Sequence, residues 1–235
     1  MIRYHPEPEM LLEFSAGTLG LAHSLCISAH LEFCNQCRQQ VQQFQDLGSV
    51  LFEETEVPVH SLDSMKSKLF AQLDQEDILQ NRIDSKTVET IEMDQAGSVN
   101  NSKIPNALRQ FVPDTFTGVD WSRVTPSFFF ASLSREQDGS ELALTRIKPK
   151  GSVAHHRHTG AEYTLVLEGS YSDEDGLYQP GDFICMNNGE AHKPIATSNS
   201  ECICLTLVER PIQFTGWFTR ILNPFLMRRQ GVSES

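Results

Sequence analysis

Residues 151–162 read GSVAHHRHTGAE and residues 180–192 read PGDFICMNNGEAH, and these two stretches decide the fold of the C-terminal half. Alternate side chains of an extended strand point to the same face. His156 and His158 therefore share one face, whereas His155 points to the other. Gly, Pro, Asn and Asp around the histidines are turn residues, so each stretch predicts short strands separated by tight turns.

The sequence around these stretches has the same character. Short runs rich in β-branched and aromatic residues recur after Pro105, with turn residues between them. Many short strands of this kind predict a β-sandwich or β-barrel. The strands expected are Phe128–Leu133, Leu142–Ile147, Tyr163–Leu167, Phe183–Met186 and Cys202–Val208.

Both quoted stretches resemble the two sequence motifs of the cupin family. The resemblance implies a cupin β-barrel of jelly-roll type that holds one metal ion inside. Its implied ligands are His156, His158, Glu162 and His192. Three imidazoles and one carboxylate suit Zn²⁺, Mn²⁺, Fe²⁺ or Ni²⁺, and ligand softness does not separate these ions. The alternative is a metal-free cupin with polar core histidines, in which burying so many unpaired polar groups would be costly.

The first eighty residues have a helical pattern instead. From Glu7 to Leu47 apolar residues recur at spacings of three and four, which is typical of amphipathic helices. Gly17-Thr18 predicts the end of the first helix, and Gly48-Ser49 predicts the end of the third. A further helix is expected from Ser61 to Leu73. The fold class expected for the whole chain is therefore a small helical bundle followed by a β-barrel.

A cluster of soft metal ligands lies within the helical part. His30 and Cys34 are four residues apart, so one helical turn brings them to the same face. Cys34-Asn-Gln-Cys37 adds a second thiol, and zinc prefers four such ligands in a tetrahedron. His23 is about 10 Å along the axis from His30, too far to share an ion. The spacing does not choose between Cys26 and His5 as the fourth ligand. A redox dithiol is the alternative, but such pairs usually follow a strand.

This pattern resembles the zinc-containing anti-sigma domain family. The resemblance rests on His5-Pro6 before an amphipathic helix, on residues 16–19 (AGTL), and on the His30-x3-Cys34-x2-Cys37 cluster. It covers about the first eighty residues. It implies that His5, His30, Cys34 and Cys37 bind Zn²⁺.

Bulk composition narrows the class of partner and the compartment. The net charge of −12 argues against direct nucleic-acid binding, which needs a basic face. Residues 1–90 hold 14 acidic against 6 basic side chains, which suits a basic protein partner or simple solubility. No stretch approaches the roughly 20 apolar residues of a membrane span, and no signal peptide precedes the helices. Six cysteines are too few for a disulfide scaffold, so we expect a cytoplasmic protein.

Composition also predicts the domain boundaries. Residues 1–80 form the helical zinc-binding domain, 81–104 a polar linker, 105–210 the cupin domain, and 211–235 an amphipathic tail. The tail is typical of a segment that packs on the barrel or on a second copy, which allows a homodimer, and a membrane-surface helix would look similar. The spacing of Cys202 and Cys204 predicts that both side chains lie on one face of a strand. They could serve there as buried core thiols or as a redox pair.

Both motifs in this order resemble the ChrR-type family of zinc-binding anti-sigma factors. The resemblance implies a regulator rather than an enzyme. It would bind and inhibit a group IV (extracytoplasmic-function) sigma factor through its helical domain, and its cupin domain would be needed for the response to oxidative stress such as singlet oxygen. A cupin dioxygenase or isomerase with an accessory zinc module is the competing interpretation. A metal or small-ligand sensor with another partner is the third.

Overall fold

A computed structural model describes residues 2–55, 64–72, 104–113, 115–136 and 138–216. Contacts divide the chain into two compact units, residues 1–47 together with 102–235, and residues 48–101. Most of the predicted linker (81–104) and most of the predicted tail (211–235) lie outside the described residues. The first unit contains both metal-ligand motifs.

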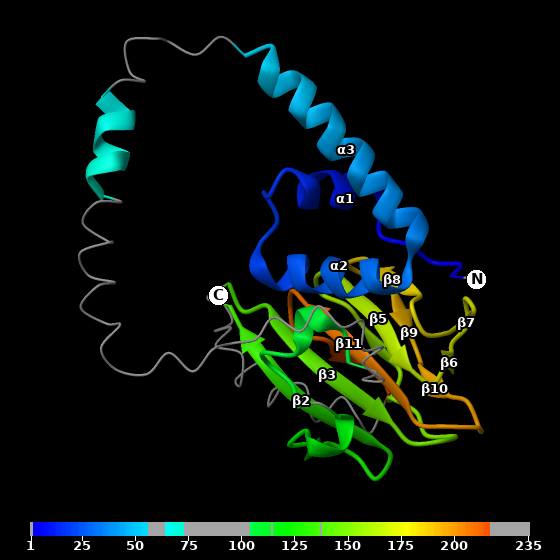
Figure 1. Ribbon diagram of the computed structural model, residues 1–235. Helices are drawn as coiled ribbons and strands as arrows, with labels where there is room; N and C mark the ends of the chain where they lie inside the picture. The colour runs from blue at the N-terminus through cyan, green and yellow to red at the C-terminus, as the bar shows by residue number, and fades with distance from the viewer. Residues whose placement is uncertain (1, 56–63, 73–103, 114, 137, 217–235) are drawn as a thin grey trace, which may run out of the picture. The chain divides into compact units, whose positions relative to one another are not determined.

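Three α-helices precede the barrel: α1 (Pro8–Ser15), α2 (Leu21–Phe33) and α3 (Asn35–Glu53) (Figure 1). Pro8 occupies the first turn of α1, where its missing N–H leaves no hydrogen bond unmade. The first helix ends where predicted, because Gly17 adopts a positive φ of 69°. Helix α2 buries side chains around much of its circumference, which is typical of a helix covered on more than one side.

The predicted end of the third helix at Gly48-Ser49 is wrong, because α3 continues to Glu53. Glycine within a helix costs only about 1 kcal/mol relative to alanine and keeps its backbone hydrogen bonds. The apolar residues Val50, Leu51 and Phe52 continue the helical pattern beyond it. In the second unit, residues 64–72 are helical, within the range predicted for a further helix.

The C-terminal part is built from antiparallel strands, which two 3₁₀ turns precede in the chain, η1 (Asn106–Leu108) and η2 (Phe116–Gly118). The described strands are β1 (Ser122–Arg123), β2 (Phe128–Arg135), β3 (Glu141–Ile147), β4 (His156–Arg157), β5 (Glu162–Glu168), β6 (Tyr171–Ser172), β7 (Leu177–Tyr178), β8 (Phe183–Met186), β9 (Ala191–His192), β10 (Ile195–Ala196), β11 (Cys202–Val208) and β12 (Gln213–Phe214). Strands β8 and β11 have the predicted bounds, and the other three predicted strands are one to two residues longer.

A six-stranded sheet in the order β1-β2-β3-β11-β5-β8 forms one wall of the barrel. Two three-stranded sheets, β10-β6-β7 and β12-β4-β9, form the rest. In the second of them, His156 pairs directly with His192 across β4 and β9, which brings together the two quoted motifs. Helices followed by an antiparallel barrel confirm the expected fold class.

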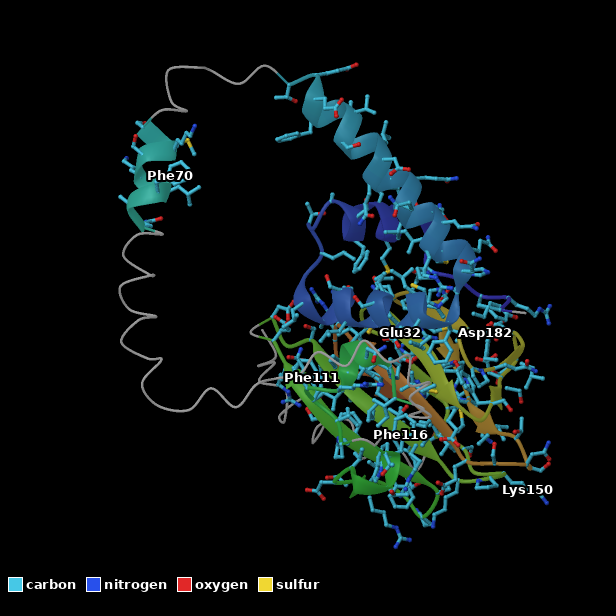
Figure 2. All side chains as sticks on the ribbon, viewed as in Figure 1. Glu32, Phe70, Phe111, Phe116, Lys150 and Asp182 are labelled. Carbon is cyan, nitrogen blue, oxygen red and sulfur yellow. The ribbon has the colours of Figure 1, made fainter. Side chains whose placement is uncertain are left out.

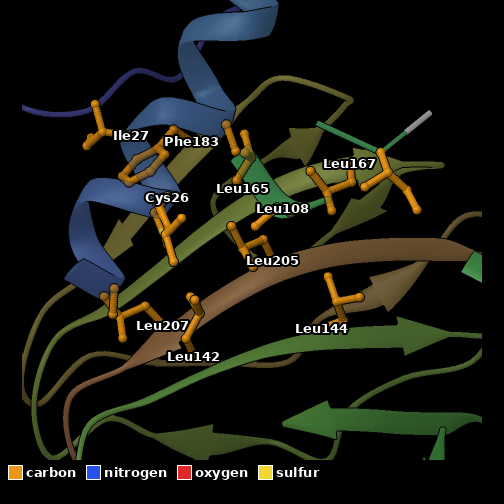
Figure 3. Packing of buried hydrophobic residues seen from close by; sticks show 14 of the residues in the cluster. Cys26, Ile27, Leu108, Leu142, Leu144, Leu165, Leu167, Phe183, Leu205 and Leu207 are labelled. Atoms are coloured by element: carbon orange, nitrogen blue, oxygen red, sulfur yellow. The ribbon is translucent and has the colours of Figure 1, made fainter. Parts of the chain in front are cut away.

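The two faces of the six-stranded sheet bury different side chains. Leu142 and Leu144 of β3 belong to a hydrophobic cluster shared with α2, whereas Ala143 and Thr145 line the inside of the barrel. Figure 3 shows Cys26 of α2 beside leucines of β5 and β11. Because both faces are buried, these strands are apolar along most of their length rather than alternating. The helices and the barrel therefore share one hydrophobic core.

Polar contacts reinforce this junction. The carboxylate of Asp182 accepts hydrogen bonds from the backbone N–H groups of Arg3 (2.8 Å) and Tyr4 (3.3 Å). The carboxylate of Glu32 in α2 accepts from the Asn106 side chain (3.0 Å) and from the Ala107 N–H (3.2 Å), which ties η1 to the helix. Figure 2 labels Asp182 and Glu32 near the border of helices and strands.

Candidate metal centres and the barrel cavity

The four predicted residues of the helical part meet in one place. Donor atoms of His5, His30, Cys34 and Cys37 all lie within 4.8 Å of one another. His30 Nε2 is 3.3 Å from Cys37 Sγ, and His5 Nδ1 is 3.4 Å from each thiol sulfur. Nitrogen and sulfur bound to one tetrahedral zinc ion at the usual bond lengths would lie about 3.6 Å apart. The donor types and their spacing fit zinc.

Local structure explains how the sequence builds this cluster. Cys34 is the residue between α2 and α3, with an extended backbone that turns the chain after His30. Cys37 lies in the first turn of α3, where its N–H donates to Cys34 Sγ (3.4 Å). His5 arrives from the segment before α1, which Asp182 fastens to the barrel through the neighbouring Tyr4. The cluster therefore depends on the barrel as well as on the helices.

The barrel also orients His30. Its Nδ1 lies 2.9 Å from the carbonyl oxygen of Gly181, so Nδ1–H donates and Nε2 faces the thiols. Gly181 has a φ of 92°, and a Cβ there would approach Ile2 to 2.7 Å and Phe33 to 2.9 Å. Only glycine fits this close approach. Residues 180–182, which the sequence marked simply as the opening of a strand, thus support the first cluster.

The protonation states of His30 and Cys37 determine how these two residues could bind a metal. Burial lowers the pKa of His30 to about 4, which keeps the imidazole neutral at pH 7. Burial and the neighbouring Cys34 raise the pKa of Cys37 to about 12. A metal ion would displace the thiol proton, so binding there should release protons and weaken at low pH.

Cys26, the other candidate for the fourth ligand, and His23, which spacing excluded, both lie elsewhere. Cys26 is fully buried in the shared hydrophobic core, and burial raises its pKa to about 12. His23 lies 3.5 Å from Glu209 and stacks edge-on against Tyr163. The structure therefore brings His5 rather than Cys26 to the other three donors.

The three histidines of the cupin motifs form the second cluster. His156, His158 and His192 place donor atoms within 4.8 Å of one another, and His156 Nε2 is 3.1 Å from His192 Nε2. Two nitrogens bound at right angles to one ion at about 2.1 Å would lie about 3.0 Å apart. Glu162 Oε2 lies 3.5 Å from His158 Nδ1. The three histidines thus form one donor cluster inside the barrel, and the Glu162 carboxylate lies beside it, next to His158.

His158 is the observation that most favours an ion here. It is 1% exposed, and neither ring nitrogen forms a hydrogen bond with any residue that the structure describes. Burial, with His156 and His192 nearby, lowers its pKa to about 3. The pKa of His156 falls to about 4 for similar reasons. A buried, neutral imidazole that makes no hydrogen bond is costly in a metal-free barrel and is a ready metal ligand.

Neighbouring groups orient the other two rings. His156 Nδ1–H donates to the carbonyl oxygen of Ala154 (2.9 Å), and His192 Nδ1–H donates to Asp173 (3.0 Å). Such contacts fix the ring and leave Nε2 for a metal. Asp173 also accepts from the hydroxyl of Tyr178 (3.0 Å), whose ring packs on Tyr4. Sequence reasoning missed Asp173 because it lies 19 residues from His192.

Other polar residues noted in the sequence lie outside this cluster. His155 is exposed and contacts Thr215, as strand alternation predicted. Cys202 and Cys204 are buried with their sulfurs 3.7 Å apart, so they do share a face. Cys185 is half-buried on β8. The described cysteines are all free thiols.

The second cluster opens onto a cavity of about 610 Å³ between the six-stranded sheet and the β12-β4-β9 sheet. His156, Glu162 and His192 contribute to its wall. Aromatic and aliphatic side chains make up much of the remainder. The size and lining of this cavity were not predicted, because it lies between strands that are far apart along the chain.

Known proteins resemble both the helical part and the barrel of this chain. Residues 112–210 match the family described as the ChrR cupin-like domain. The anti-sigma-E factor ChrR of Cereibacter sphaeroides is 28% identical over 225 residues, which cover 95% of this chain and 98% of that protein. This chain is similar to ChrR over almost the whole length of both proteins. Its similarity to ChrR spans the helices and the barrel, as the order of the two motifs predicted.

Solved structures extend the comparison. ChrR in the crystal structure of Rhodobacter sphaeroides SigE in complex with the anti-sigma ChrR superposes with a TM-score of 0.68 and 25% identity, over 88% of this chain and 99% of that chain. An RmlC-like cupin protein from Ralstonia eutropha superposes with a TM-score of 0.38 and 13% identity, over 51% of this chain and 88% of that chain. Among the residues that the structure describes, no helix combines the length and apolarity needed to cross a membrane.

Proposed function

We propose that this chain is an anti-sigma factor that binds and inhibits an extracytoplasmic-function sigma factor. The observation that carries the proposal is the similarity to ChrR over almost the whole of both chains, with both metal-ligand clusters assembled. In this proposal the barrel has a regulatory rather than a catalytic role, and it is needed for the response to oxidative stress. Sigma factors act on RNA polymerase, so the chain would work in the cytoplasm.

The proposal includes two metal ions with different tasks. Zn²⁺ held by His5, His30, Cys34 and Cys37 would fix the helices to one another and to the N-terminal segment. An ion held by His156, His158, Glu162 and His192 would offer a Lewis-acidic site inside the barrel. The second ion is Zn²⁺, Mn²⁺, Fe²⁺ or Ni²⁺, all of which accept imidazole and carboxylate ligands.

Exposed apolar side chains on α3 supply a surface for the sigma factor. Leu47, Val50 and Leu51 recur at i, i+3 and i+4, and each is more than half exposed. Phe52 beside them is 78% exposed. Contiguous exposed apolar residues of this kind mark protein–protein contacts, because leaving them in water is unfavourable.

Charge favours the same type of partner. The net charge of −12 leaves the chain unsuited to nucleic acid but suited to a protein with a basic surface. Such complementarity mainly raises the association rate and specificity, whereas the apolar residues would supply most of the affinity.

The test is a binding and transcription assay with the full chain. The chain should co-purify with an extracytoplasmic-function sigma factor from the same organism and inhibit transcription by the corresponding holoenzyme. Leu51→Asp should weaken binding by about tenfold or more, because it places a charge in the apolar surface. Leu177→Asp, on exposed β7, is the matched control and should bind normally. Normal inhibition by Leu51→Asp, or no binding by the unaltered chain, would contradict the proposal.

A further inference from the structure

We propose that the barrel cavity binds an apolar organic molecule that carries one carboxylate head group. Binding itself is a property of the barrel, and its use as a regulatory signal rests on the proposed function. The argument uses the size of the cavity, the chemistry of its walls and the position of its polar end.

The size fits a small organic ligand. A volume of about 610 Å³ lies in the range of roughly 300–1,000 Å³ that is usual for such sites. A cavity of this size that opens to solvent and is lined mainly by apolar side chains has the form usual for a small-molecule site.

The walls are apolar over most of their area. The side chains that give this character are Val124, Phe128, Phe130, Val153, Ile212 and Phe214. Several hydroxyls of the lining are paired with protein groups: Thr145 with Thr206 (3.3 Å), Thr164 with Glu162 (3.0 Å) and Ser132 with Glu141 (2.8 Å). Arg135 lines the cavity too, but its guanidinium pairs with Glu141 at 2.7 Å. The long part of a ligand would therefore meet little that could hydrogen-bond.

The polar region formed by the second cluster is buried. His156 and His192 are 3% and 2% exposed, and both line the cavity together with Glu162. Val124, which is 53% exposed, lines the same space, so the cavity reaches solvent there. The polar groups of the second cluster therefore lie at the buried end of this cavity, and apolar side chains line the part nearer the solvent. A ligand would enter with its oxygen-bearing head towards the histidines and keep its apolar body along the phenylalanines.

A carboxylate is the head group that the second cluster would accept. A divalent ion held by neutral histidines and one glutamate keeps a net positive charge and favours an anionic oxygen ligand. Cys204 also lines the cavity, but its hydrogen bond with Cys202 and its burial raise its pKa well above the usual value. The protonated thiol is a poor nucleophile, so Cys204 acts as part of the apolar wall.

Titration calorimetry on the full, Zn²⁺-loaded chain tests the proposal, with octanoate as the probe. Octan-1-ol is the control without the carboxylate, and acetate is the control without the apolar body. Octanoate should bind with a stoichiometry of about one per chain, and each control should bind about tenfold more weakly or worse. Equal affinity for octanoate and octan-1-ol would overturn the assignment of the head group. Absence of octanoate binding would overturn the site.

Two variants locate the binding. Val124→Trp should narrow the opening and weaken octanoate binding by about tenfold, whereas Leu177→Trp, exposed but outside the cavity, should not. Unchanged binding by Val124→Trp would overturn the location. A chain that ends at Gly216 tests whether residues 217–235 fill the space. Octanoate binding only after that truncation would make the chain itself the occupant and overturn the proposal.

The same protein preparations separate this proposal from the proposed function. Inhibition of the sigma factor should persist in Val124→Trp, because the apolar surface of α3 is unaltered. A chain that inhibits the sigma factor and does not bind octanoate would refute the ligand site alone. A chain that binds octanoate and no sigma factor would refute the anti-sigma role and leave the ligand site standing.

Discussion

Leu207→Ala should destabilise the helices and the barrel together. Leu207 lies on β11, is fully buried, and belongs to the hydrophobic cluster that also contains Leu25, Cys26 and Ile27 of α2. If this is one core, removing side-chain volume from the barrel side must also weaken the packing of the helix. The substitution therefore tests whether the two sequence motifs fold as one cooperative unit.

The magnitude follows from burial. Leu→Ala removes three carbons, which at about 0.8 kcal/mol each lowers the transfer free energy gained on folding by about 2.4 kcal/mol. The cavity left behind adds to this, because sheet on one side and helix on the other limit relaxation. We expect the free energy of unfolding to fall by about 3–4 kcal/mol, within the range measured for buried leucines. For a domain of ordinary stability that is a large fraction of the total.

Guanidinium chloride titrations at fixed zinc concentration can measure the effect with two probes. Far-ultraviolet circular dichroism follows the helices, and tryptophan fluorescence, measured in a Trp217→Phe background, follows Trp121 near the barrel. Both transitions should move to lower denaturant by the same amount. Leu177→Ala, at a site that is 44% exposed, is the matched control and should cost less than about 0.5 kcal/mol. A fluorescence transition that moves while the helical transition stays in place would refute the single shared core.

Three further predictions concern the metal-ligand residues. Joint substitution of Cys34 and Cys37 by Ser should remove about one metal ion per chain by elemental analysis, because two thiolate ligands are lost, whereas Cys185→Ser should retain it. The metal-free chain should lose stability as the pH falls from about 6.5 towards 4, because the pKa values of His30 and His156 are lowered to about 4 in the folded chain and the unfolded chain takes up protons first. Each of these two histidines should lower the free energy of unfolding by about 2 kcal/mol at pH 5. An unchanged urea midpoint between pH 7 and 5 would argue against buried neutral rings. His192→Ala should weaken induction by oxidative stress in a reporter assay and leave repression intact. Joint substitution of Cys202 and Cys204 by Ser should change induction little. Normal induction in His192→Ala, with induction lost in the double cysteine variant, would assign the sensor to the thiols.

Features that depend on local spacing were predictable from the sequence. His156 and His158 share a face because strand residues alternate. His30, Cys34 and Cys37 are close in sequence, and they converge because Cys34 turns the chain between the last turn of α2 and the first turn of α3. The strand Cys202–Val208 was predicted with its observed bounds, since β-branched and apolar residues between turn signals leave few alternatives. In each case the backbone geometry alone sets which side chains are neighbours.

Features that depend on closure of the chain were decided by the tertiary structure. Spacing left Cys26 and His5 as equal candidates, and only the fastening of Tyr4 to Asp182 brings His5 to the thiols. Gly48 predicted a helix end, but a glycine costs too little to stop a helix whose pattern continues. The cavity formed because strands distant in sequence became opposite walls. The sequence determined the residues within each short segment that could act together, and packing determined which segments meet, because contacts between distant residues depend on the whole folded chain rather than on local backbone geometry.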